Sequence, residues 1–208
     1  MKRKFIWAIL FLSAITVNGQ KSSFELIGGF NYSIATNQRI DFTPQFGIQT
    51  GLMINTPVIN EKFSLKKGLI FISRNFNSPT EVIYTDAGFT GSVFVANDFK
   101  LNHLQVPIYL NYEVSNGINI SIGGMAESLI KSKSQYFSGA YVEPLDWDSM
   151  IKINDFAYGF SGGVEYQLSK LSISATYQHQ LNELSNELSS GIGSSNIQSL
   201  LLTFSYSL

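Results

Sequence analysis

Two histidines are the side chains of this sequence best suited to acid–base chemistry. His103 and His179 are its only histidines, and it contains no cysteine. A histidine paired with a serine and a carboxylate could support a hydrolase or an acyltransferase. No short motif beside either histidine joins a base to a nucleophile, so catalysis is the less favoured interpretation. Without cysteine, disulfides and thiolate metal sites are excluded, and we expect no metal or cofactor.

Eight segments would position these residues, and in each of them large apolar residues alternate with small or polar ones. A period of two is typical of β-strands with two unlike faces. The segments cover residues 24–34, 45–55, 63–74, 103–112, 118–125, 156–168, 171–178 and 199–208. The second face consists mainly of Gly, Ser, Thr, Gln and Asn, and its ionisable members are Glu25, Lys66, Arg74, His103 and Glu165.

The composition of the two faces indicates which one points outward. A soluble lipocalin-like barrel would show a face rich in Lys and Glu to water. Charged residues make up only 14% of this chain, against roughly a quarter in typical soluble domains. The sequence therefore predicts an all-β fold, an eight-stranded antiparallel up-and-down transmembrane β-barrel with its apolar face toward lipid. A soluble periplasmic binding barrel is an alternative.

Eight strands enclose a space that side chains can fill. We therefore expect a plugged lumen rather than a general pore, with the five ionisable residues paired in a structural network. The predicted plug comprises Glu25, Gln45, Gln49, Lys66, Arg74, His103, Gln105, Tyr109, Glu165 and Gln178.

The amino terminus predicts export. Three basic residues precede an apolar run over 5–17 and small residues near position 19, as in a secretory signal peptide. We predict a signal peptide over 1–19 and one barrel domain over 20–208. Loss of the three basic residues makes the mature chain more negative than the formal −1 of the whole sequence, which argues against nucleic acid as a partner.

The connections between the segments alternate between long and short. This asymmetry is typical of bacterial outer-membrane barrels, whose short turns and chain ends are periplasmic and whose long loops are extracellular. We expect residues 75–99 to form a hairpin above the membrane. Ten acidic residues fall in or beside the long connections and predict a negative outer face: Asp41, Glu81, Asp86, Asp98, Glu127, Glu143, Asp146, Asp148, Glu183 and Glu187.

Three short stretches carry a family resemblance. They are LQVPIYLNY at 104–112, GGVEY at 162–166 and FSYSL at 204–208. With these stretches the chain resembles the PorT-like outer-membrane β-barrel proteins of Bacteroidota. The resemblance implies recognition by the barrel assembly machinery through Phe204, Tyr206 and Leu208, the last of which stands where an aromatic residue is common. One namesake takes part in a protein secretion system, and most relatives have no assigned activity.

The sequence therefore favours an integral outer-membrane protein of structural, adhesion or assembly-accessory type. Its expected partners are outer-membrane lipid, the assembly machinery, and an extracellular or envelope protein that contacts the long loops. The alternative is a lipid-modifying enzyme that uses His103 or His179.

Overall fold

The computed structural model describes residues 22–36, 43–59, 62–86, 89–137, 154–184 and 195–208, with side chains except at 59, 78–97 and 134–137. The alternating segments form strands β1 (Ser23–Thr36), β2 (Thr43–Ile59), β3 (Phe63–Asp86), β4 (Phe89–Ser115), β5 (Ile118–Phe137), β6 (Phe156–Leu168), β7 (Leu171–Gln180) and β8 (Asn196–Ser207). Within these ranges no helix is long and apolar enough to cross a bilayer. The predicted signal peptide and five of the ten acidic residues (Asp41, Glu143, Asp146, Asp148 and Glu187) lie outside them.

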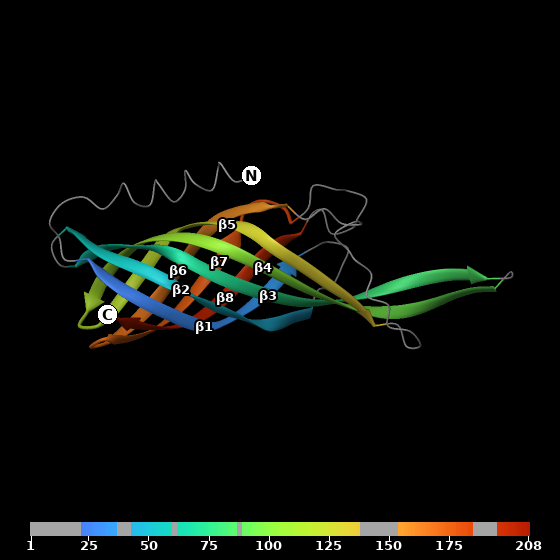
Figure 1. Cartoon of the computed structure of the whole chain (residues 1–208), viewed down its shortest axis with the longest axis horizontal. Helices are drawn as coiled ribbons and strands as arrows, with labels where there is room; N and C mark the ends of the chain where they lie inside the picture. The colour runs from blue at the N-terminus through green and yellow to red at the C-terminus, as the bar shows by residue number, and fades with distance from the viewer. Residues whose placement is uncertain (1–21, 37–42, 60–61, 87–88, 138–153, 185–194) are drawn as a thin grey trace.

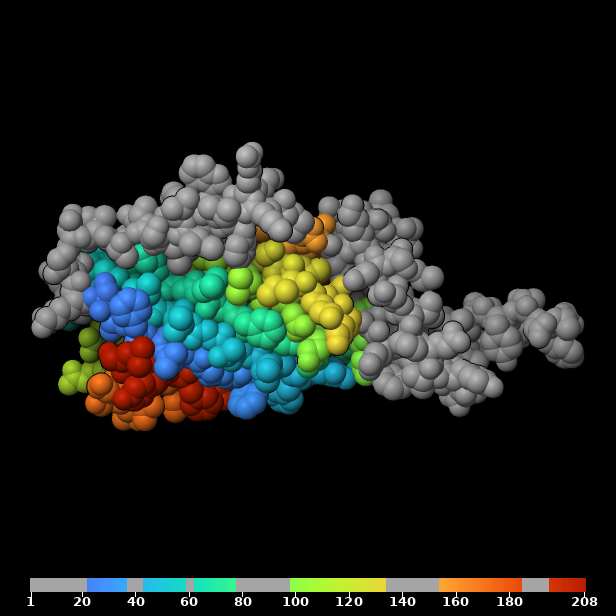
Figure 2. All heavy atoms as spheres, viewed as in Figure 1, coloured from blue at the N-terminus to red at the C-terminus, as the bar shows by residue number. Residues whose placement is uncertain are grey.

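The strands form one closed antiparallel sheet in which each pairs with its neighbours in sequence (Figure 1). Closure occurs between β1 and β8, whose paired residues run from Glu25↔Ser207 to Thr36↔Asn196. On the face shown in Figure 2, side chains of β1 to β5 form a continuous wall. The predicted eight-stranded barrel is confirmed.

The apolar residues face outward. On β1, Phe24, Leu26 and Phe30 are about half exposed, whereas Glu25 and Asn31 on the opposite face are only 5% and 1% exposed. The same contrast continues around the barrel to β8, where Leu200 is 56% exposed and Leu201 is 2% exposed. A water-soluble barrel would show the reverse pattern, so the apolar surface is the one that meets lipid.

Strands β3 and β4 extend far beyond the barrel wall. β2 pairs with β3 only as far as Asn77, and β5 pairs with β4 only as far as Ala96. Residues 80–86 and 89–95 therefore pair only with each other and form a two-stranded hairpin, which we call the outer ribbon (Figure 1, green). This is the hairpin that the sequence predicts over 75–99.

The connection predicted between residues 126 and 155 is too long, because β5 continues to Phe137. The error arises from a β-bulge. Asn102 pairs with Lys131 and His103 with Leu129, so Ile130 is an extra residue in β5. Because an extra residue reverses which side chains face inward, the alternation of the sequence changes phase here.

Glycines on the inner face make room for large side chains on the neighbouring strand. Met53, Tyr109 and Met125 pair with Gly68, Gly123 and Gly159, respectively. A Cβ added at Gly123 would collide with the backbone carbonyl of Ile108, whereas one added at the outward-facing Gly28 has nothing within 4 Å. The narrow interior therefore depends on glycine at specific inward positions.

Gly123→Ala should lower the free energy of unfolding by about 1–3 kcal/mol, because the added methyl group forces the backbone apart. Gly28→Ala is the matched control and should change it by less than about 0.5 kcal/mol. Urea unfolding in lipid vesicles, followed by the gel-mobility difference between folded and unfolded barrel, measures both. Equal losses would contradict this account.

Candidate functional site: the barrel interior

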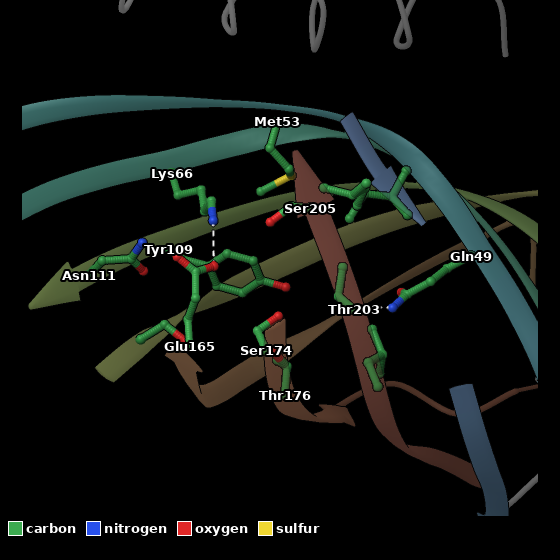
Figure 3. A pocket seen from close by; sticks show the side chains of 14 residues that line it. Gln49, Met53, Lys66, Tyr109, Asn111, Glu165, Ser174, Thr176, Thr203 and Ser205 are labelled. Carbon is green, nitrogen blue, oxygen red and sulfur yellow. Dashed lines mark hydrogen bonds and ion pairs between the residues drawn. The ribbon is translucent and has the colours of Figure 1, made fainter. Parts of the chain in front are cut away.

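The described side chains of the interior form four layers, and the layer nearest the start of β1 and the end of β8 is ionic. Lys66 of β3 lies between two carboxylates. Its Nζ is 2.8 Å from Glu25 Oε2 of β1. It is 2.6 Å from Glu165 Oε2 of β6, a contact that Figure 3 shows. All three side chains are nearly buried. The layer carries one cation and two anions, so each charge has a partner but the group keeps a net negative charge.

A cavity of about 40 Å³ adjoins this layer (Figure 3). Gln49 and Asn111 line it, and their side-chain oxygens are buried without a hydrogen-bond partner. The amide nitrogen of Gln49 donates to Thr203 Oγ1 at 2.7 Å. A cavity of this size has room for a few water molecules, which would satisfy the two oxygens. Beside it Ile27, Met53, Ile70 and Tyr109 form the second, apolar layer.

The third layer is centred on Arg74. Its Nη1 donates to both carboxylate oxygens of Glu127 at 3.0 Å, and its Nε donates to Ser199 Oγ at 3.2 Å. Arg74 and Glu127 are 1% and 2% exposed. Gln105 donates to Glu127 Oε2 and exchanges hydrogen bonds with Gln178, all at 3.1 Å. A buried ion pair needs such additional hydrogen bonds to offset its loss of hydration.

The fourth layer is an apolar cap at the end of the barrel that carries the outer ribbon. Its buried members are Ala35, Phe76, Leu101, Leu184 and Ile197, and Phe99 and Leu129 pack against them. Leu184 comes from the connection after β7. Its N–H donates to the carbonyl of Ser195, and its own carbonyl accepts from the N–H of Asn154, both at 2.8 Å. Leu184 is thereby held in the apolar cap.

The five ionisable residues that the sequence assigns to the lumen lie there in two separate groups. Glu25, Lys66 and Glu165 form the first layer, and Arg74 and His103 belong to the third, where His103 Nδ1 lies 3.4 Å from Arg74 Nη1. Gln45 is exposed, contrary to prediction, because the register of β2 and β3 shifts between Gln45 and Ile48.

Glu127 is the principal residue that the sequence-based prediction misplaced. We predicted it in an acidic outer connection, but it is the buried partner of Arg74. The signal that could have located it is the parity of β5. Glu127 continues the inward series of Ser121, Gly123 and Met125, one step beyond the predicted end of the strand.

The two histidines lie on opposite faces of the wall and form no common site. His103 is 2% exposed in the third layer. His179 faces outward, with its ring centroid 5.1 Å from that of Phe160 and its Nδ1 3.4 Å from Tyr177 Oη. A catalytic base must reach its substrate, and only His179 is accessible to lipid. Among the described residues, no group of three His, Cys, Asp or Glu side chains could hold a metal ion.

The three residues of the predicted assembly signal lie on the outer side of the closing strand, near its end. Phe204, Tyr206 and Leu208 are 46%, 43% and 65% exposed. The N–H of Leu208 donates to the carbonyl of Phe24 at 2.9 Å, and Lys170 lies over the ring of Tyr206 at 5.7 Å. The terminal segment is therefore ordered against β1 and the turn between β6 and β7.

Comparison with known proteins agrees with this architecture. The family model described as the outer membrane protein beta-barrel domain matches residues 18–186. The chain belongs to this family. It is accordingly a protein of the outer membrane. No curated protein matches its sequence.

Two solved structures are similar to this member of the outer-membrane barrel family. Neisserial surface protein A has 10% sequence identity and a TM-score of 0.51, with 90% of this chain and 99% of that chain covered. Ail, the attachment invasion locus protein of Yersinia pestis, has 12% identity and a TM-score of 0.48, with 92% and 100% covered. At 10% identity the similarity to Neisserial surface protein A concerns the fold alone.

Glu127→Gln should destabilise the barrel by about 3–5 kcal/mol, because Arg74 would keep a buried charge without its counterion. Replacing both residues by Met should restore much of that loss. Glu165→Gln is the matched control and should have a smaller effect, because Lys66 keeps Glu25. Urea unfolding in lipid vesicles measures all three variants. Equal losses for the two Glu→Gln variants would refute the distinction between the layers.

Proposed function

We propose that this outer-membrane barrel is a non-conducting anchor that presents the outer ribbon and the long connections to a partner protein. The single observation that carries the proposal is the filled interior. Two ionic and two apolar layers succeed one another along the lumen, which leaves the ends of the barrel as the places where the protein can act. Both chain termini would lie in the periplasm and the ribbon outside the cell, as the lengths of the connections favour.

The ribbon is suited to recognition through its backbone. Residues 80–86 pair only with 89–95, so both long edges of the hairpin lack a strand neighbour in the described sheet. Exposed edges bind extended peptide segments by adding a strand. A hairpin of two strands is also marginally stable in water on its own and would gain from a third strand. We infer a partner that contributes an extended segment, as in adhesion or in assembly of an envelope complex.

The PorT-like resemblance of residues 104–112 favours the assembly-accessory form of this function. Such a role would also use the signal peptide over 1–19 for export, and Phe204, Tyr206 and Leu208 for recognition by the assembly machinery. A lipid-modifying activity is less favoured, because His103 is buried beside a cation and His179 is surrounded by aromatic rings.

In planar bilayers the purified barrel should give no stable conductance steps, because the four layers fill its lumen. Regular single-channel steps from the unmodified protein would refute the closed-anchor proposal.

Replacing residues 80–95 by an Asn-Gly turn, which joins the paired residues Pro79 and Ala96, should leave urea unfolding of the barrel unchanged and abolish partner contact. The readout is photo-crosslinking in intact cells, with a benzophenone residue at position 83 of the ribbon and a control at position 169 in the opposite turn. We expect a discrete cross-linked protein only from position 83. A strain lacking the ribbon should lose surface attachment or secretion to the same extent as a deletion strain. Full retention of both would contradict the proposal.

A further inference from the structure

Three lysines cluster on the outside of the barrel near the ribbon. Lys100 of β4 pairs directly with Lys133 of β5, and Lys131 pairs with Asn102, one step along the same face. All three lysines are exposed, and none forms an ion pair with a described carboxylate. Like charges directly opposite each other destabilise a sheet. We call Lys100, Lys131 and Lys133 the lysine cluster.

The Ile130 bulge is what turns this cluster outward. Before the bulge, odd-numbered residues of β5 face the lumen, as the buried Met125 and Glu127 show. Without the extra residue, Lys131 and Lys133 would continue that inward series. Bulges commonly redirect side chains in this way. Both lysines therefore reach the outer surface through a local backbone feature.

The cluster lies at the edge of the apolar belt. Along β4, the outward residues Leu110, Ile108, Val106 and Leu104 lead to Asn102 and then to Lys100. On β5, Ile130 is 58% exposed immediately before Lys131. The apolar band of an outer-membrane barrel ends at the level of the lipid headgroups. The three ammonium groups are therefore at headgroup level, with apolar side chains directly beside them.

We propose that the lysine cluster binds the phosphate of a membrane lipid headgroup, with the acyl chain of that lipid against Ile130 and Leu104. A phosphate offers several acceptor oxygens to ammonium donors and removes the repulsion between the paired lysines. The nearest outward carboxylate on β4, Asp98, accepts a hydrogen bond from Asn77 Nδ2 at 2.7 Å. The adjoining apolar residues favour a lipid over a soluble polyanion. This site goes beyond the proposed function and does not depend on the ribbon or on the direction of insertion.

The test is a titration of the detergent-solubilised full chain with fluorescent phosphorylated lipid A. Each lysine near a membrane surface contributes about five-fold to anionic lipid binding, so replacing all three by Gln should raise the dissociation constant about a hundred-fold. Replacing all three by Arg should retain binding, which shows that charge matters rather than a change in folding. Lys62→Gln with Lys170→Gln is the control at the opposite end and should have no effect.

Two further ligands separate the sources of phosphate. Dephosphorylated lipid A should bind weakly and equally to the wild type and the triple Gln variant. The phosphorylated headgroup sugar without acyl chains should bind much more weakly than intact lipid A. Equal binding of lipid A by the wild type and the folded triple Gln variant would overturn the proposal. Equally tight binding of the soluble headgroup sugar would overturn the lipid assignment in favour of a soluble anion.

Discussion

The absence of hydrogen-bond partners in hydrocarbon is the constraint on which this structure depends. Every backbone N–H and C=O at membrane depth must be paired within the protein, and a sheet achieves this only when its first and last strands join. Pairing of β1 with β8 meets that requirement. The arrangement of side chains is the reverse of that in a water-soluble protein. The apolar residues face lipid, and the polar residues share a narrow lumen.

That narrow lumen explains why the buried charges take their particular form. A charge removed from water needs a counterion and further hydrogen bonds. Lys66 obtains two carboxylates, whereas Arg74 obtains one carboxylate together with Ser199 and Gln178. The inward glycines provide the space for these long side chains. A lumen organised in this way has little room left for transport, which is why we assign function to the outside.

The sequence predicts the eight strands and the membrane-facing side because alternation is a local property. It also places Glu25, Lys66, Arg74, His103 and Glu165 inside, but it does not indicate which of them pair. Lys66 and Glu165 are 99 residues apart, and their contact depends on register and closure. Glu127 was misplaced because a polar residue near a strand end has the same appearance in a lumen as in a loop. No distinctive residue type marks the Ile130 bulge in the sequence. The exchange of inward and outward positions at this point was therefore not apparent.

The bulge connects the interior to the outer surface. Up to Leu129, β5 contributes to the lumen, and beyond Ile130 its lysines face away from it. Without the bulge, two more cations would enter the region of Arg74, where Glu127 is already paired. Exclusion from the lumen therefore explains why the lysines point outward. It does not explain why three lysines occupy adjacent positions, since neutral residues would avoid both the burial of cations in the lumen and the repulsion between paired lysines. An anionic ligand supplies the missing favourable interaction.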